Sequence, residues 1–450
     1  MASLAKQFVS ALLNSTSNST SSSAGMKAAA RDLPPVLLTM PNNHGTLAAA
    51  RSLGRAGVRV VAADPGALSI TSWSKYTTTQ LRCPMVRRSA EFLDWLIDFG
   101  RRSERHVLLA TCDDTVWLYA KYREQLSPYF HVPQLNVEVL HRLLNKRLMS
   151  EQASIAGLDV PKTWFPADDQ ELNEVARIVR FPVLLKPVTQ AFFLPRHKGF
   201  NVTNSEELLR EYAILCTHPY GKDVKDYDAS VTRPMVQEFY GDASAKGIYS
   251  ISGYMRGGRV LNPLASRKVL QWPRRLGVGV CFEEATLDEK LVEGVTRLAN
   301  QVGFSGTFEA EFVQDGARRL LIDFNPRFYN QMAFDIARGS PLPLLAYEDA
   351  TGRDLGATAS KSARNGATKP RIYVHGSAAG LMLGSQGLSG AMDATELSTW
   401  RRWYDRHRGE RIDAVHDSED RAPALLDAAL LLKACMRHPQ HFFKNIVRNR

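Results

Sequence analysis

A strand-helix-strand unit near the start of the sequence constrains the fold most. An apolar strand over 36–40 leads into a loop and a helix rich in Ala, Leu and Arg, and a second strand over 58–63 ends at Asp64. Strands joined through a helix run parallel in one sheet. A further strand, HVLLATCDD, precedes another helix and continues the pattern. The sequence therefore predicts an α/β domain over 32–134 with a doubly wound parallel sheet.

The carboxyl ends of these strands are where such sheets bind ligands. The residues at those ends are Asn42, Asn43, His44, Asp113 and Asp114. We expect them to help bind an acceptor substrate. A dinucleotide cofactor is not expected, because MPNNHGTLAA lacks the GxGxxG pattern that lets the backbone approach a pyrophosphate.

The pattern changes from about residue 135. The segment LHRLLNKRLMSEQASIAGLDVPKTWF predicts one amphipathic helix that ends near Gly157 and Pro161. A short strand, FPVLLKPV, follows, and then a strand, a loop and a hairpin that turns at Gly257 and Gly258. A helix over 287–302 precedes two strands, GTFEAEFVQ and RRLLIDFNP. Neighbouring strands covered by helices indicate a second, α+β domain.

Composition and charge limit the partners. Lys and Arg exceed Asp and Glu by 57 − 46 = +11, so the surface should attract anions. No basic block or aromatic-basic repeat appears, and we expect no nucleic-acid partner. The five scattered cysteines form no CxxC pair and favour a reducing compartment without structural zinc. No run approaches the roughly 18 apolar residues that cross a bilayer, so we expect a cytoplasmic protein that is soluble or peripheral to a membrane.

Both ends of the chain differ from the middle. Residues 1–31 are Ser-rich and lack acids, which predicts a disordered tail, with a transit peptide as the alternative. The last predicted helix, APALLDAALLLKACMRHPQHFFKNIVRNR, combines an apolar stripe with a basic end. Such a helix either lies on an anionic membrane surface or packs on its own domain.

A polar row interrupts the apolar strand LLIDFNPRFYN. Alternation places Asp323, Asn325 and Arg327 on one face, and on the other face it places Leu320, Ile322 and Phe324. The preceding strand adds Glu309 and Glu311 on one face. Carboxylates this close repel each other unless a cation lies between them, and oxygen-only ligands favour Mg²⁺ or Mn²⁺. The alternative is a solvated face of an antiparallel sheet.

The register of these two strands tests the metal interpretation. A two-residue turn at Asp315-Gly316 would place Glu311 opposite Leu320 and turn Asp323 to the other face. A shared ion therefore requires a three-residue loop or one bulged residue between the strands.

Basic residues suggest an anionic ligand. Lys186 interrupts an apolar strand, where an unpaired ammonium is costly. Lys146 lies on an otherwise ordinary helix. A basic cluster of Arg267, Lys268, Arg274 and Arg275 surrounds QWP and suits phosphate, although such clusters are often only solvated.

The order of these parts resembles the ATP-grasp superfamily, and within it the carboxylate-amine ligases whose first domain resembles that of carbamoyl phosphate synthetase. The resemblance covers about 37–352 and follows the motifs NKRLMSEQASIAGLDVPKT, FPVLLKPV, MVQEFYGD, SRKVLQWPRRLGVGV, GTFEAEF and IDFNPRFYNQMAFDIARG. It implies a linker helix and a small lobe over 135–236, a large lobe with the metal site over 237–360, and a C-terminal extension over 361–450 that ends in the basic helix.

The resemblance also implies roles for individual residues. The lysines that hold ATP phosphates match Lys146 and Lys186. The hinge that meets adenine matches Gln237, Glu238 and Phe239, and the acid on the ribose matches Asp242. The magnesium ligands match Glu311, Asp323 and Asn325. The catalytic arginine of NPR matches Arg327, and the basic residue that steadies the acyl phosphate matches Arg267 or Lys268.

Two positions depart from the family pattern. Asp323 replaces the usual glutamate and is one methylene shorter, which alters the bridging of two ions. The phosphate-covering loop VTQAFFLPRHKGF holds one glycine instead of several, so Arg196, His197 and Lys198 either act as cationic fingers or read the acceptor.

The activity implied is an ATP-dependent, ADP-forming ligase that joins a carboxylate to an amine through an acyl phosphate. The partners are then small-molecule substrates, and a homodimer and a membrane contact stay open. One rival is an ATP-grasp phosphotransferase that stops at a phosphorylated product. The other is a non-catalytic nucleotide-binding or membrane-surface module.

Overall fold

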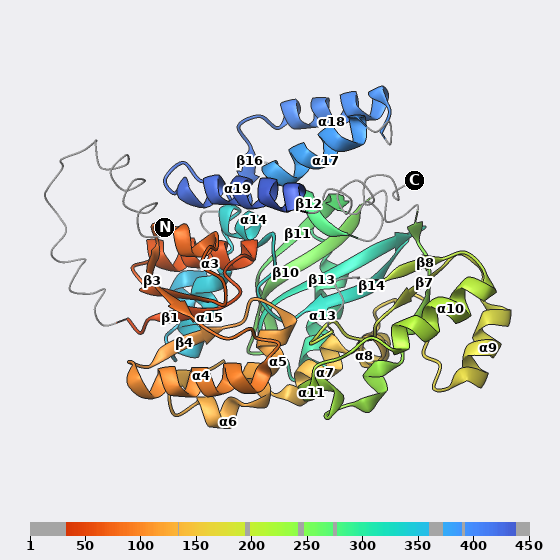
Figure 1. The fold of residues 1–450 in the computed structure, drawn as a ribbon, viewed down its shortest axis with the longest axis horizontal. Helices are drawn as coiled ribbons and strands as arrows, with labels where there is room; N and C mark the ends of the chain where they lie inside the picture. The colour runs from red at the N-terminus through yellow and green to blue at the C-terminus, as the bar shows by residue number, and fades with distance from the viewer. Residues whose placement is uncertain are drawn as a thin grey trace, which may run out of the picture.

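The computed structural model describes residues 33–133, 135–193, 199–241, 247–272, 277–359, 372–388 and 392–437. Three sheets organise these residues (Figure 1). Several predictions lie outside them: the Ser-rich tail, Asp242, the cationic loop residues 196–198, Arg274, Arg275 and the end of the basic helix.

The first sheet is parallel, as predicted, with the strand order β3-β2-β1-β4-β5. Its strands are β1 Val36–Leu38, β2 Val60–Asp64, β3 Thr77–Arg82, β4 His106–Leu109 and β5 Phe130–His131. Helix α4 (Ser89–Arg102) connects β3 to β4, and helices α5 (Asp113–Lys121) and α6 (Arg123–Leu126) connect β4 to β5. One face packs on α4 and α5, and the other on α3 (His44–Arg55) and on α15 (Leu342–Ala350). Because both faces are covered, the central strands are apolar except for Asp64 at the end of β2 and His106 at the start of β4.

The predicted linker helix is two helices, α7 (Val137–Leu144) and α8 (Lys146–Ile155). Asn145 separates them and caps α8, because its side chain accepts hydrogen bonds from the backbone N–H groups of Arg147 and Leu148. Lys146 therefore begins α8, and its backbone N–H donates to Val188 O at 2.7 Å.

The second sheet is small and antiparallel, with the order β6-β9-β7-β8. Its strands are β6 Thr163–Trp164, β7 Val183–Lys186, β8 Phe200–Val202 and β9 Met235–Glu238. Helices α9 (Asp169–Ile178) and α10 (Ser205–Cys216) cover it at the right of Figure 1. The short α11 (Lys222–Lys225) precedes β9.

The third sheet has the order β14-β13-β10-β11-β12-β15-β16 and is mostly antiparallel. Its first five strands in sequence are β10 Ile248–Arg256, β11 Arg259–Trp272, β12 Val278–Ala285, β13 Gly306–Asp315 and β14 Arg318–Asn325. The predicted hairpin turns at Gly257 and Gly258, which both have positive φ. Helices α8 and α13 (Glu289–Val302) pack on one face of the sheet. The mixed architecture confirms the predicted fold class.

The C-terminal region extends the third sheet and contacts the first domain. Strands β15 (Ile372–Val374) and β16 (Arg411–Asp413) extend the third sheet. Helices α17 (Gly376–Leu388), α18 (Ala394–Arg406) and α19 (Ala422–Arg437) lie along the top of Figure 1. The short α14 (Met332–Ala337) lies beneath them and contacts α3 and β16.

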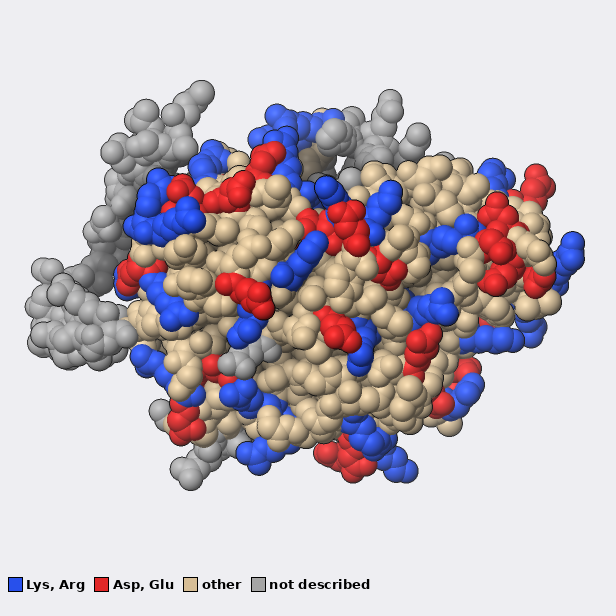
Figure 2. Space-filling view, turned by 90° about the horizontal axis from the view of Figure 1, so that it is seen from below, with Lys and Arg blue, Asp and Glu red and all other residues tan. Residues whose placement is uncertain are grey.

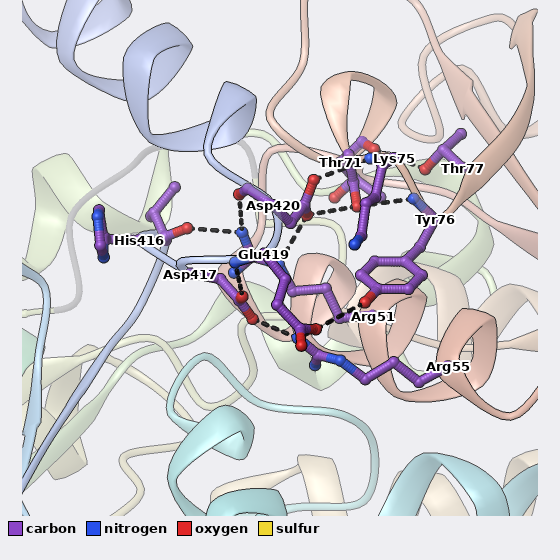
Figure 3. A network of polar contacts seen from close by, with 12 residues as sticks. Arg51, Arg55, Thr71, Lys75, Tyr76, Thr77, His416, Asp417, Glu419 and Asp420 are labelled. Atoms are coloured by element: carbon purple, nitrogen blue, oxygen red, sulfur yellow. Dashed lines mark hydrogen bonds and ion pairs between the residues drawn. The ribbon is translucent and has the colours of Figure 1, made fainter. Parts of the chain in front are cut away.

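A polar network ties this region to the first domain (Figure 3). Arg51 of α3 forms a buried ion pair with Asp420, at 2.9 Å between Nε and Oδ2. Ser74 Oγ and Lys75 N also donate to Asp420, at 2.6 and 2.8 Å. Because the carboxylate is almost fully buried, losing one of these partners would leave a charge that water cannot solvate.

On the face that Figure 2 shows, acidic and basic side chains are interspersed, and neither sign of charge gathers in one patch. Helix α19 leaves Leu425, Leu432 and Met436 exposed. Among the described residues, no helix is long and apolar enough to cross a membrane. Contact of the basic C-terminal end with a membrane stays a prediction.

Candidate active site

A cavity of about 300 Å³ lies between the second and third sheets. It collects ten of the predicted site residues, namely Lys146, Lys186, Gln237, Glu238, Phe239, Lys268, Glu311, Asp323, Asn325 and Arg327. They come from α8, β7, β9, β11, β13 and β14 and from the residues that follow β9 and β14. Residues from across the sequence thus converge on one site.

The floor of the cavity shows the register that a shared cation requires. Glu311 pairs with Asp323, and Glu309 pairs with Asn325. The turn lies at Gly316 and Ala317, one residue later than the turn considered from sequence, and a bulge at Ile322 shifts the register between Glu311 and Phe312. The extra residue in β14 turns Asp323 to the side of the sheet that Glu311 faces.

The same bulge corrects the predicted apolar face of β14. The side chains that pack in the core beside α13 are Leu321 and Phe324. Leu320 and Ile322 lie instead with Ile248 and Val313, and Ile322 lines the cavity. Simple alternation failed because it does not count the bulged residue.

Two lysines neutralise the two opposed carboxylates. Lys268 Nζ lies 3.0 Å from Glu311 Oε1, and Lys146 Nζ contacts Asp323 Oδ1. Burial alone would lower the pKa of Lys268, but the acidic neighbours, Glu311 above all, outweigh it and raise that pKa above its usual value. The two lysines therefore hold the cationic positions that a metal ion would otherwise fill.

Glu309 differs from Glu311 in its surroundings. It is 2% exposed, and the amides of Asn325 and Gln331 donate to its two oxygens. Burial and the neighbouring charge of Glu311 raise the pKa of Glu309 to about 8. Glu309 is thus largely protonated at neutral pH and acts as a hydrogen-bonding support beneath Asn325.

Arg327 joins this floor to the first domain. Its Nε donates to Asp113 Oδ1 at 2.6 Å, and its Nη2 donates to Asn325 Oδ1 at 2.9 Å. Burial opposes the charge, but Asp113 raises the pKa of Arg327 above its usual value. The guanidinium is therefore a fixed cation at the end of the row.

Another part of the cavity is lined by apolar side chains with hydrogen-bonding groups beside them. Leu184, Ile248, Val313 and Ile322 line it together with Phe239 and Tyr240. Gln237 is buried and donates to Thr163 Oγ1 at 3.0 Å, and Tyr240 OH donates to Glu238 at 2.8 Å. An apolar lining beside hydrogen-bonding groups suits a planar heterocycle.

Not every predicted residue reaches the cavity. Arg267 is exposed and pairs with Glu283 at 2.6 Å, because alternation along β11 turns it away from the side that Lys268 faces. Of the two alternatives, Lys268 is the residue inside the cavity. Asp242 lies outside the described residues.

Of the residues predicted at the strand ends of the first domain, some line the cavity and others do not. Asp113 lines the cavity, but Asp114 accepts a hydrogen bond from Phe192 N at 2.6 Å and pairs with Arg87. Asn43 donates to Thr111 O at 3.2 Å, and Asn42 to Asp64 at 3.5 Å. Asp114, Asn43 and Asn42 therefore support the fold around the cavity and do not line it.

Sequence reasoning missed Gln331 and Gln271, which both line the cavity. Gln331 could have been suspected because it follows the NPR motif closely, where a polar side chain in an apolar segment needs a partner. Gln271 begins the QWP segment that the basic cluster surrounds, but the sequence did not mark Gln271 itself as a site residue.

Comparisons with known proteins agree with this architecture. No family model matches the chain. A segment of 153 residues is 26% identical to D-aspartate ligase of Enterococcus faecium, over 31% of this chain and 36% of that ligase. The match thus spans about a third of the length of this curated relative.

Solved structures are similar over most of the chain. The biotin carboxylase domain of Hydrogenobacter thermophilus 2-oxoglutarate carboxylase, solved with MgADP and bicarbonate, has a TM-score of 0.57 at 14% identity and covers 72% of this chain and 71% of that one. N5-carboxyaminoimidazole synthetase of Staphylococcus aureus with ADP gives 0.54 at 14%, over 72% and 79%. An L-amino acid ligase of Bacillus licheniformis gives 0.52 at 15%, over 71% and 75%. At these identities the shared property is the ATP-grasp fold.

Proposed function

We propose that this chain, which has the ATP-grasp fold, is an ATP-dependent and ADP-forming ligase that joins a carboxylate to an amine. The observation that carries the proposal is the opposition of Glu311 and Asp323 across a bulged hairpin, with Lys268 and Lys146 on them. Such a floor binds cations and phosphate, and the apolar end of the same cavity suits adenine. The roles of individual residues are part of the proposal.

The donor set fits a magnesium ion. Glu311, Asp323 and Asn325 offer only oxygen ligands to an ion on the cavity side, as Mg²⁺ and Mn²⁺ prefer. When bound, the ion would neutralise and align the β- and γ-phosphates of ATP. Asn325 Oδ1 accepts one hydrogen bond from Arg327 in this structure, and an amide oxygen has a second lone pair with which it can bind an ion.

The residues of the chain would then act on phosphate. Lys146 and Lys186 hold the phosphates of ATP, and Gln237, Glu238 and Phe239 hold its adenine. The substrate carboxylate attacks the γ-phosphorus, the bond to ADP breaks, and an acyl phosphate forms. Lys268 and Arg327 steady its negative charge. An amine then attacks the acyl carbon, phosphate leaves, and the nitrogen loses a proton to give an amide.

The substrate class follows from similarity and charge together. Two of the similar proteins are, by name, ligases of amino acids. The net charge of +11 favours acidic substrates. We therefore place amino acids and short peptides first among the candidate substrates. We further propose that the protein is soluble and cytoplasmic. Whether it forms a homodimer is left as an open alternative.

The test is a screen for ADP release with the full chain, Mg²⁺, ATP and pairs of carboxylates and amines, followed by mass spectrometry of the product. An amide formed with equal amounts of ADP and phosphate supports the ligase. ADP formation with a carboxylate but without an amine in the product supports the rival phosphotransferase. No turnover with any pair, despite nucleotide binding, supports the non-catalytic module.

A further inference from the structure

Two histidines and one aspartate meet outside the cavity. His44 begins α3, His375 follows β15, and Asp427 lies in α19. One potential ligand atom from each lies within 4.8 Å of the others. His375 Nε2 is 3.2 Å from Asp427 Oδ2, and the rings of His44 and His375 are 4.2 Å apart between centroids. Three distant segments of the chain thus place three metal-binding groups together.

The arrangement does not match a nucleophilic triad. Ser377 Oγ is 3.1 Å from His375 Nε2 and also donates to Asp427 Oδ2. In a Ser-His-Asp triad the serine and the aspartate contact opposite nitrogens of the imidazole. Here both contact the same nitrogen, so the aspartate cannot orient the ring for the serine.

We propose that His44, His375 and Asp427 form a binding site for a divalent transition metal of the Zn²⁺ class. Two imidazole nitrogens and one carboxylate favour Zn²⁺ over Mg²⁺, which prefers oxygen ligands. Bonds of about 2.0–2.1 Å in a tetrahedron place ligand atoms roughly 3.3 Å apart. The observed 3.2 Å between His375 and Asp427 already matches this spacing.

The surroundings favour ligation as well. All three residues are only partly buried, so an ion can reach them. Three protein ligands leave a fourth position for water or another small ligand.

The site would couple the C-terminal region to the cavity. Gly45, next to His44, packs so closely on Tyr329 that an added Cβ would lie 2.4 Å from Tyr329 O. Tyr329 lines the cavity. A metal ion on His44 would therefore fix α19, β15 and the start of α3 beside the cavity wall. This inference stands apart from the proposed ligase activity.

The chain offers a matched control. His141 Nε2 lies 2.9 Å from Asp228 Oδ2, a similar His-Asp pair, and the rings beside His141 are those of Trp117 and Tyr227. This pair is not part of a three-ligand group among the described residues. It should not bind a transition metal tightly.

The experiment uses the full chain, stripped with a chelator and then titrated with Zn²⁺ in excess Mg²⁺, which occupies the cavity carboxylates. Bound zinc is counted by elemental analysis after gel filtration, and the d–d spectrum is recorded with Co²⁺. We expect about one Zn²⁺ per chain, and His44→Ala, His375→Ala and Asp427→Asn each to weaken binding at least about tenfold. His141→Ala and Asp323→Asn should keep the zinc.

A thermal shift makes the test independent of variants that fold poorly. Zn²⁺ should raise the Tm of the wild type and of His141→Ala, because it binds only the folded chain. No stoichiometric zinc, or zinc that all three ligand variants retain, would overturn the proposal. The cluster would then be a hydrogen-bonded contact that docks α19. Activity is not a readout, so failure of the ligase proposal leaves this test unaffected.

Discussion

Lys268 and Glu311 form an ion pair inside the cavity, with 3.0 Å between Nζ and Oε1, and Lys268 is 6% exposed. Glu311 therefore depends on an internal cation, and Glu309 lies buried nearby. The adjacent residue on β11, Arg267, pairs with Glu283 at the surface. One strand thus presents a buried and an exposed ion pair at successive positions.

Replacing Lys268 should destabilise the protein. Lys268→Ala leaves Glu311 without its cation, and breaking a buried pair costs about 3–5 kcal/mol. Arg267→Ala should cost less than about 1 kcal/mol, because solvent screens an exposed pair. Urea unfolding without Mg²⁺ measures both. Equal losses in the two variants would contradict the buried pair.

The buried Glu309 should make stability depend on pH. Its pKa is raised to about 8 in the folded chain. Between pH 4.5 and 8 the unfolded chain releases this proton while the folded chain keeps it, so the unfolding free energy falls as pH rises, by up to about 1.4 kcal/mol per unit. Unfolding curves at pH 5.5 and 7.5 should show this fall in the wild type. Glu309→Gln should lose this part of the dependence, and an unchanged slope would show that Glu309 is ionised.

Lys146 should contribute to nucleotide binding, and Arg147 should not. Lys146 points into the cavity and contacts Asp323, whereas the exposed Arg147 pairs with Glu151 at 3.2 Å. Calorimetry with ADP and Mg²⁺ should show a Kd about tenfold higher or more for Lys146→Ala, since a hydrogen bond to a charged group contributes about 1.5–3 kcal/mol. Arg147→Ala should bind as the wild type does. Identical Kd values for all three proteins would remove Lys146 from the phosphate site.

Gly45 should not tolerate a side chain. Alanine normally stabilises a helix by about 1 kcal/mol relative to glycine. At Gly45 the new Cβ would lie 2.4 Å from Tyr329 O, which is backbone and cannot move aside alone. We expect Gly45→Ala to lower both the Tm and the nucleotide affinity. Gly380→Ala in α17 is the control, because no atom outside its own stretch of helix lies within 4 Å of the new Cβ. It should keep the nucleotide affinity, and its Tm should stay the same or rise.

The sequence was sufficient for features that depend on local pattern. The βαβ unit, the hairpin at Gly257-Gly258 and the need for an odd register shift near Glu311 follow from alternation and turn chemistry, and the structure has all three. The sequence showed that a register shift was required, but it did not show that the bulge lies at Ile322. Leu320 and Ile322 were therefore assigned to the wrong face.

Other features depend on contacts between distant segments. Asn145 lies within an amphipathic pattern, and the helix break there is accompanied by distant contacts, Asn145 Nδ2 with Asp228 Oδ2 and Lys146 N with Val188 O. The return of α19 to α3 through Asp420 and Arg51, and the meeting of His44 with His375, join opposite ends of the chain. No local pattern encodes such pairings.

The route through an acyl phosphate is the central claim, and an oxygen-transfer measurement tests it most directly. A carboxylate substrate found active in the screen is labelled with ¹⁸O on both oxygens and converted with Mg²⁺, ATP and its amine. Attack of the carboxylate on the γ-phosphorus predicts that the released phosphate carries one ¹⁸O and the amide keeps the other. Unlabelled phosphate, or label in AMP, would contradict the account.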